Sequence, residues 1–316
     1  MVEDTRPPID YMQRTKDYYL GLGYGNPYQW ACFDEVPFTK PVKKLSKMRI
    51  AIITTAAPYQ PDKGDQGPGA AYNAAAKFFS VYRLPIEPEP DLRVSHIAID
   101  RVHTSAKDSA TFLPLAAMRR AHHLGKIGSI APHIYGFPTN RSQRTNMDID
   151  CPQLIRQLQK DQIEGIIAVP NCPVCHQSIS LAARAAEAVG IASVIMGCAL
   201  DIVRHVGVPR FYFSDFPLGN SCGRPNDVAS QDQTLQGALD LLAAAEKPRT
   251  IWHSALRWHG PENWKDDYAN IAKLSKHEIA SRRADFDNAK QAAKTGKEQA
   301  GKEQAGAPNP ALPRRA

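Results

Sequence analysis

Apolar residues follow two alternating patterns along most of this chain. Short continuous runs rich in Ile, Val, Ala and aromatic residues are typical of strands buried on both faces of a sheet. Between these runs, apolar residues recur every three or four positions, which predicts helices. The predicted strands are 48–59, 94–100, 129–137, 163–171, 191–199 and 209–215, and the predicted helices are 108–128, 151–162, 175–190, 200–207 and 227–248.

The alternation of strands and helices from residue 129 onward indicates an α/β fold. Right-handed crossovers then give a doubly wound, mostly parallel sheet with helices on both faces. In such a sheet, ligands bind beyond the carboxyl ends of the strands. The loops predicted to border the binding site are Thr54–Gly69, Gly136–Arg144, Pro170–Cys175 and Ser214–Pro225.

The composition changes at both ends of the predicted α/β domain, residues 48–275. Residues 1–47 are aromatic, and their glycines and prolines lie too close together for long regular elements. We expect this N-terminal arm to lie over the body of the protein or over a neighbouring subunit of a homo-oligomer. Residues 276–316 are charged, and their end repeats GKEQA and has few large apolar residues, so we expect a disordered tail.

Charge and composition exclude several classes of protein. The 316 residues carry a formal net charge of +7, and the tail supplies +4 of it through nine Lys or Arg against five Asp or Glu. A nucleic-acid-binding face is therefore poorly supported. There is no run of eighteen apolar residues and no apolar signal region at the N-terminus, so we expect a cytoplasmic protein that does not bind a membrane. A reducing compartment would keep the six cysteines as thiols.

Two of these cysteines, Cys172 and Cys175, fall between a predicted strand and a predicted helix, and His176 follows them. The free N–H groups and the positive dipole end of the first helical turn favour a thiolate at this place. A spacing of three residues also allows the two sulfurs to form a small disulfide loop that another thiol can reopen. The pattern predicts a redox-active or nucleophilic thiol pair.

Two other interpretations of the pair stay open. A single Cys-x-x-Cys supplies only two metal ligands, whereas structural zinc takes four, and no second pair exists in the chain. The cysteines could equally be small apolar fillers. His176 could raise the thiolate fraction or donate a proton, or it could simply end at the helix terminus in solvent. Cys198 ends the next strand and is a candidate third thiol, and Cys222 is expected to be exposed in a turn-rich loop.

The segment VPNCPVCHQSISLAARAAEAVGIASVIMGCALDIVRHVGVPRFYFSDFPLGN (169–220) resembles component B of the glycine, sarcosine and betaine reductases and the related D-proline reductase subunit, the selenoprotein B family. The resemblance extends over 36–225. It implies that Cys172 stands where the family often has selenocysteine and attacks a substrate carbon α to a carbonyl. Cys175 is then the resolving thiol, and an external dithiol, thioredoxin-like or small, resets the pair. The family also uses a pyruvoyl group on a partner subunit.

Further candidate substrate contacts come from polar residues near the predicted site. His96 and Asp100 match a family segment near an early strand, although they could be surface residues. Loop arginines could bind a carboxylate as bidentate donors, and asparagines could donate beside the thiol pair. These candidates are Arg141, Arg144, Asn171 and Asn220.

Several functions remain compatible with the sequence. The first is a thiol-dependent reductase of a small substrate, as in amino acid degradation. A desulfurase or sulfur-transfer enzyme would use the same dithiol with a different substrate. A non-catalytic binding subunit and a metal-binding regulator are the other classes. Residues 61–69 lack the glycine spacing of a phosphate-binding loop, so no nucleotide site is predicted.

Overall fold

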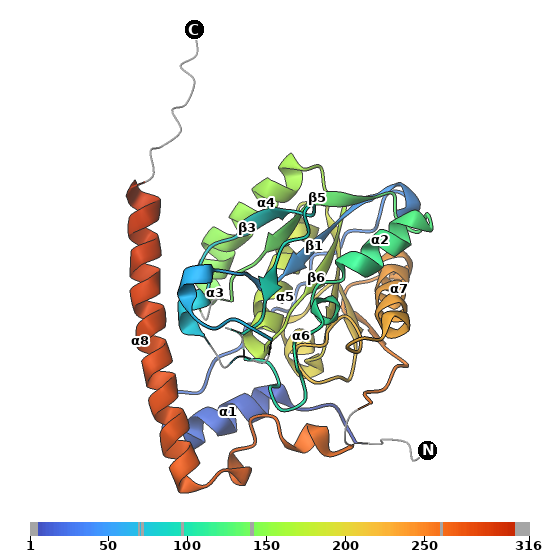
Figure 1. Cartoon of the computed structure of the whole chain (residues 1–316). Coiled ribbons are helices and arrows are strands. Elements are labelled where there is room, and N and C mark those ends of the chain that lie inside the picture. Colours follow the sequence, from blue (N-terminus) through green and yellow to red (C-terminus); the bar gives the residue numbers. More distant parts are fainter. Residues whose placement is uncertain are drawn as a thin grey trace.

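A single sheet organises the body of the protein (Figure 1). The computed structural model describes residues 6–68, 70, 73–95, 98–139, 142–259 and 262–306. Within these residues, all strands of the sheet are parallel except β3, which runs antiparallel at one edge. In spatial order the strands are β3 (Tyr82–Pro85), β5 (Ser129–Gly136), β1 (Arg49–Thr54), β6 (Gly165–Val169), β7 (Ala192–Gly197), β8 (Arg210–Phe213) and β9 (Thr250–His253).

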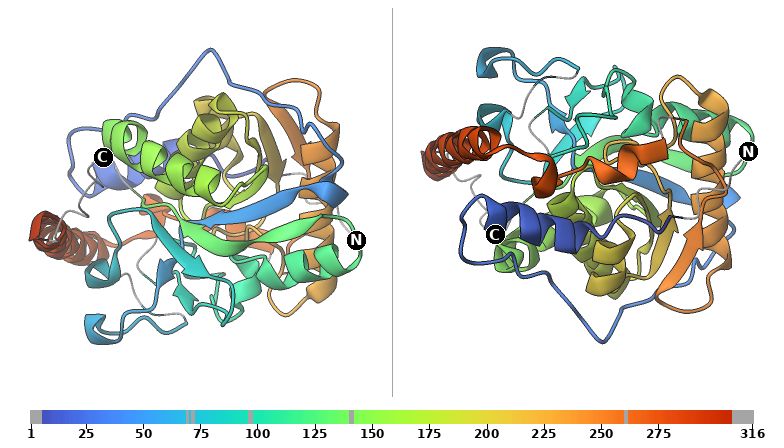
Figure 2. Two further views of the ribbon diagram at one scale, coloured as in Figure 1. Left: turned by 90° about the horizontal axis from the view of Figure 1, so that it is seen from above. Right: turned by 90° about the horizontal axis from the view of Figure 1, so that it is seen from below.

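Helices cover both faces of this sheet, as Figure 2 shows from above and below. This arrangement confirms the predicted α/β class. One face is covered by α4 (Cys151–Lys160), α5 (Pro173–Ala188) and α6 (Leu200–Val206), and the other by α2 (Leu115–His123) and α7 (Val228–Ala244). The short helix α3 (Gln143–Thr145) precedes α4, and β2 (Ala57–Pro58) pairs with β4 (Leu92–Arg93) as a separate ribbon.

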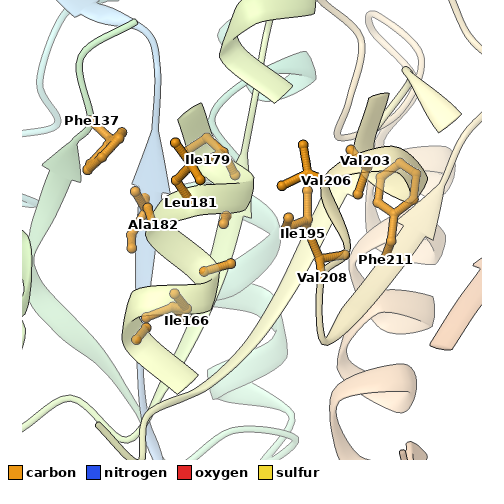
Figure 3. Close-up of a cluster of buried hydrophobic side chains, with 14 of the residues drawn as sticks. Phe137, Ile166, Ile179, Leu181, Ala182, Ile195, Val203, Val206, Val208 and Phe211 are labelled. Atoms are coloured by element: carbon orange, nitrogen blue, oxygen red, sulfur yellow. The ribbon is translucent and has the colours of Figure 1, made fainter. Parts of the chain in front are cut away.

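The core consists of two apolar layers, one on each face of the sheet. Side chains alternate between the faces of a strand. In β1, Ala51 and Ile53 therefore join the layer under α4, α5 and α6, whereas Ile50 and Ile52 join the layer under α2 and α7. Figure 3 shows part of the first layer, in which Ile179 of α5 packs over the sheet.

The carboxyl ends of β1 and β6 form a switch point of the sheet. The two strands are neighbours, and Thr54 pairs with Val169 at their carboxyl ends. The chain leaves β1 toward α2 on one face and leaves β6 directly into α5 on the other. Connections that diverge in this way leave a crevice where ligands bind in open α/β sheets. The loop with Cys172 and Cys175 follows the carboxyl end of β6, beside this switch point.

The N-terminal arm contains a helix, which corrects the sequence prediction. The helix α1 (Tyr11–Gly21) begins after Asp10, whose carboxylate accepts a hydrogen bond from the N–H of Gln13 at 2.8 Å. Residues 11–20 contain no glycine or proline, so nothing interrupts the helix that this cap starts. The crowding of turn residues applies only to the part of the arm after Gly21.

Residues 276–306 also differ from the prediction, because they form the helix α8 (Lys276–Gly306) along one side of the body (Figure 1). Phe286 packs against the rings of Tyr19 and Tyr24, with centroids 5.2 and 5.1 Å apart, and Arg283 lies 3.7 Å from the Tyr24 centroid. The Ala, Lys, Gln and Glu residues of this segment have high helix propensity. The predicted tail beyond residue 306 lies outside the described residues.

The predicted strand at 94–100 is wrong over its described residues. The strand β4 ends at Arg93, and the following residues form turns and loop. Their described backbone groups bond to loops instead of to a strand: the Ser95 carbonyl accepts from the N–H of Asn73 at 3.2 Å, and the Asp100 N–H donates to the Leu218 carbonyl at 3.1 Å. The strands β3 and β9 were not predicted. Both are short edge strands with exposed positions, so their sequences lack the continuous apolar character of the central strands.

The strands of the sheet lie between Arg49 and His253, inside the predicted α/β domain. The domain boundaries at residues 47 and 275 stay predictions. In the described ranges, no helix is both long enough and apolar enough to cross a membrane.

Candidate active site

The turn between β6 and α5 holds the two cysteines, where the sequence predicted them. Val169 is the last residue of β6, and α5 begins at Pro173 with Cys172 as its N-cap residue. The Cys172 Sγ accepts a hydrogen bond from the N–H of Cys175 at 3.2 Å. Proline suits the first helical position, because its φ is already helical and this position needs no N–H. The free N–H groups of α5 thus face the thiol pair.

Cys172 and Cys175 form a disulfide across this first turn, with their Cα atoms 4.8 Å apart. The disulfide shows that the two sulfurs face each other, as a redox pair requires. The two residues differ in exposure: Cys172 retains 5% of its surface, whereas Cys175 is completely buried. Cys172 is therefore the residue of the pair that keeps some contact with solvent.

Thr139 supplies a polar contact to this pair that the sequence analysis did not identify. Its Oγ1 lies 3.1 Å from the Cys175 Sγ. Thr139 belongs to the loop after β5, which is separated from β6 by β1 in the sheet. The only signal in the sequence is its place in the loop Gly136–Arg144, one of those predicted to border the site.

His176 is completely buried and connects the pair to the next strand. Its Nδ1 donates to the carbonyl oxygen of Cys172 at 2.7 Å. Its Nε2 accepts from the N–H groups of Cys198 and Ala199 at 3.0 and 3.2 Å. Burial lowers the pKa of the imidazole from 6.5 to about 4. The ring is therefore neutral at pH 7 and does not meet solvent, which excludes the alternative that His176 only caps the helix in solvent.

Because the imidazole of His176 is buried and neutral, we expect the protein to lose stability in acid. The unfolded chain binds a proton near pH 6.5, whereas the folded chain binds it only near pH 4, so the stabilisation is complete above pH 6.5 and is lost as the pH falls through this window. Between pH 7 and pH 4.5 the contribution of His176 to the free energy of unfolding falls by about 2 kcal/mol. Urea unfolding at both pH values measures it.

The variant His176→Gln is expected to be less stable than the wild type at pH 7. Between pH 7 and pH 4.5, its free energy of unfolding should fall by about 2 kcal/mol less than that of the wild type. The matched control is His123→Gln, at an exposed position of α2. This control keeps the acid dependence of the wild type. Equal acid dependence in all three proteins would contradict a neutral, buried His176.

Cys198 and Cys222 also lie at this edge of the sheet, and both are buried. The burial of Cys222 corrects the expectation that its loop exposes it: its N–H donates to the carbonyl of Thr111 at 2.9 Å, which holds the loop against the body. Burial raises the pKa of Cys198 to about 12 and that of Cys222 well above its usual value. Both are therefore protonated thiols at neutral pH, which makes Cys198 a poor nucleophile in this state.

Asn171 directly precedes the pair and is completely buried. Its backbone N–H and its Nδ2 both donate to the Thr55 Oγ1 at 3.1 Å. Its Oδ1 has no hydrogen-bond partner among the described residues. Asn220 is buried too, and its Nδ2 donates to the Thr104 Oγ1 at 2.7 Å and to the Pro217 carbonyl at 3.0 Å. Asn171 is thus the asparagine with an unused polar atom beside the pair.

Asp100 has partners within the fold. Its carboxylate accepts from the backbone N–H groups of Val102 and His103 and contacts the His103 Nδ1 at 3.0 Å. The His103 Nε2 lies 3.2 Å from the Asp267 carboxylate. Asp100 is 1% exposed, and these contacts tie its loop to the segment before α8. Its predicted role as a substrate contact stays a prediction.

Three further candidates are Arg144, His96 and Arg141. Arg144 is exposed on α3. His96 and Arg141 lie outside the described residues. Substrate binding by these three side chains stays a prediction.

No metal-binding cluster marks the pair in the described ranges. No group of three or more His, Cys, Asp or Glu side chains there could hold a metal ion. A cavity of about 390 Å³ lies at the opposite edge of the sheet, lined by residues that include Met48, Ile163 and Ala192. These residues lie at the amino ends of β1, β6 and β7, so this cavity is remote from the disulfide.

Comparison with known proteins identifies relatives of this chain. A family model described as Glycine/sarcosine/betaine reductase selenoprotein B (GRDB) matches residues 20–170. This match contains β1, β5 and β6 and ends two residues before Cys172. No solved structure matches the chain.

Curated relatives extend this finding. D-proline reductase subunit gamma of Acetoanaerobium sticklandii is 28% identical over 66% of this chain and 86% of its own length. Glycine reductase complex component B subunit gamma of Symbiobacterium thermophilum is 24% identical, and Betaine reductase complex component B subunit beta of Peptoclostridium acidaminophilum is 23% identical. These two matches cover 73% and 69% of this chain but only 54% and 51% of the relatives. The chain is thus similar to component subunits of the glycine, sarcosine, betaine and D-proline reductases.

Proposed function

We propose that the protein is a thiol-dependent reductase in which Cys172 and Cys175 are oxidised to a disulfide while a small substrate is reduced. The observation that carries this proposal is the disulfide at the N-terminus of α5, in a chain similar to reductase component subunits. The helix terminus and the hydrogen bond from the Cys175 N–H favour a thiolate at Cys172. These features support Cys172 as the nucleophile.

In the first step, the Cys172 thiolate attacks a substrate carbon α to a carbonyl, a C–S bond forms, and the leaving group departs with the electron pair of its bond. In the second step, the Cys175 thiolate attacks the Cys172 sulfur and breaks the C–S bond. The carbon keeps that electron pair, which the carbonyl delocalises, and takes one proton. The substrate gains two electrons and the thiol pair loses two, which leaves the disulfide.

An external dithiol is proposed to return the disulfide to two thiols and to leave as its own disulfide. Cys172 is the residue of the pair that retains exposed surface, but this surface is small. The proposal therefore requires that side chains at this edge of the sheet move aside when substrate or dithiol reaches Cys172. His176 is a positioning residue in this scheme, because it fixes the backbone of Cys172 through its Nδ1.

The names of the curated relatives support a choice of substrates and partners. D-Proline, glycine, betaine and sarcosine are the compounds that these names contain. All four are amino acids or N-methylated derivatives with a carboxylate, so we propose a substrate of this class. Most of these relatives are named as subunits of complexes, and the chain spans about half of their length. We therefore also propose a partner subunit, and a pyruvoyl group on it stays a prediction.

The test begins with the reduced protein, freed of reductant and mixed anaerobically with each of the four compounds. The expected result is one disulfide and one reduced product per protein molecule. Mass spectrometry detects the disulfide, and chromatography detects the product. Peptide mapping should assign the disulfide to Cys172 and Cys175. Addition of a cell extract from the producing strain, stripped of small molecules, supplies any partner subunit.

Three outcomes would contradict this function. Product without a new disulfide would exclude the thiol pair as the electron source. Sulfide release or a persulfide on Cys172 from a thiocarbonyl substrate would indicate a desulfurase instead. No product in the presence of the extract would favour a non-catalytic subunit.

A further inference from the structure

We propose that Thr139 is a second catalytic residue of the thiol pair, whose hydroxyl donates a hydrogen bond to the Cys175 thiolate whenever the disulfide is open. This inference rests on the proposed redox function and adds a role for the loop after β5. The Thr139 Oγ1 lies 3.1 Å from the Cys175 Sγ, within hydrogen-bond reach of a sulfur acceptor.

The burial of Cys175 makes this contact important. Cys175 is completely buried, so water cannot solvate a thiolate there, and desolvation disfavours the charged sulfur. In the described part of the chain, Thr139 provides the side-chain hydrogen-bond contact to this sulfur. The nearest helical N–H, that of Cys175, points to the Cys172 sulfur instead. The two sulfurs therefore have different stabilising groups: the helix terminus for Cys172 and the Thr139 hydroxyl for Cys175.

The difference in exposure fixes the order of the exchange reactions. A dithiol from solvent attacks, as a thiolate, the sulfur of Cys172, the residue of the pair that retains exposed surface. The S–S bond breaks, and its electron pair goes to the Cys175 sulfur, which becomes the leaving thiolate beside Thr139. The second thiol of the dithiol then attacks the mixed disulfide and releases Cys172 as a thiolate, while the dithiol leaves as a disulfide. A leaving thiolate of lower pKa departs faster, so the hydroxyl accelerates reduction of the pair.

The same contact also acts during substrate reduction, in which the disulfide forms instead of opening. Cys175 must be a thiolate to attack the Cys172 sulfur, and the Thr139 hydroxyl raises the fraction of this form at neutral pH. Thr139 thus stabilises the dithiol state in both half-reactions. Loss of the hydroxyl should make the disulfide harder to reduce.

The test uses Thr139→Val, which removes the hydroxyl at nearly constant volume, and Thr139→Ser, which restores it. Each full-length protein is equilibrated anaerobically with mixtures of reduced and oxidised dithiothreitol, trapped with iodoacetamide and analysed by mass spectrometry. For Thr139→Val we expect the equilibrium constant for reduction to fall about tenfold, which corresponds to about 30 mV in midpoint potential. Thr139→Ser should stay within about twofold of the wild type.

The pH dependence of Cys175 alkylation provides a second readout. The apparent pKa of the Cys175 thiol should rise in Thr139→Val and return in Thr139→Ser. Thr139→Ala gives a further hydroxyl-free variant in case the valine disturbs packing. Unchanged potential and unchanged Cys175 pKa in folded hydroxyl-free variants would overturn the proposal. Neither measurement uses a substrate, so these results are independent of whether the proposed reduction occurs.

Discussion

Replacement of Cys172 by serine is expected to abolish turnover of the proposed reaction, with a loss on the order of 10³-fold or more, because the attacking thiolate is removed. The disulfide should disappear as well. The air-oxidised wild type should present its four free cysteines to iodoacetamide after denaturation, and Cys172→Ser should present one more, the released Cys175. Mass spectrometry of the alkylated proteins counts the labels.

The matched control is Cys32→Ser, because Cys32 is an exposed free thiol in the N-terminal arm. This variant should lose one label and keep its turnover and its disulfide. Cys175→Ser should still form the C–S bond to substrate but should not release product. If Cys172→Ser and Cys32→Ser had equal turnover, Cys172 could not be the nucleophile.

The second large effect concerns stability, at the buried ion pair between Arg210 and Glu187. Both side chains are completely buried, and the Arg210 Nη1 lies 2.7 Å from the Glu187 Oε1. The Glu187 carboxylate also accepts from the N–H and the hydroxyl of Ser193 at 2.6 and 2.8 Å. Burial raises the pKa of Glu187 and lowers that of Arg210, because desolvation disfavours both charges. Each charge therefore depends on its partner.

Glu187→Ala is expected to lower the free energy of unfolding by about 3–5 kcal/mol, because it leaves the Arg210 charge buried without its partner. Urea unfolding at pH 7 measures this effect. The control is Glu246→Ala, which breaks the exposed pair between Lys40 and Glu246 and should cost less than about 1 kcal/mol. Similar losses of stability in both variants would show that burial does not determine the cost of breaking an ion pair in this protein.

The central part of the fold could be predicted from the sequence, because burial leaves an unambiguous pattern there. Residues of β6 and β7 are buried at every position, so their sequences are continuous apolar runs. The edge strands β3 and β9 are only half-buried and carry polar residues, so no such pattern marks them. The run at 94–100 is apolar enough for a strand, but its described backbone groups bond to loops rather than to a strand of the sheet.

Only those residues of the candidate site that are close together in the sequence could be predicted from it. Cys172 and Cys175 share one turn, so their spacing and the helix start identify them. Thr139 reaches Cys175 through the order of the strands in the sheet, and no spacing in the sequence encodes that contact. His176 was recognised as a neighbour of the pair, but its neutrality depends on burial and on partners in the next strand.

The Arg210–Glu187 pair also determines how the N-terminal arm is recognised. The N–H of Thr39 donates to the Glu187 carboxylate, and the Thr39 carbonyl accepts from the Arg210 Nη2 at 2.7 Å. The body thus holds this part of the arm by main-chain groups that nearly every amino acid carries, and the Thr39 hydroxyl adds a hydrogen bond to the carbonyl of Glu187 at 2.8 Å. Serine at residue 39 would therefore keep every contact, other residues would lose only the hydroxyl contact, and proline is excluded for lack of an N–H.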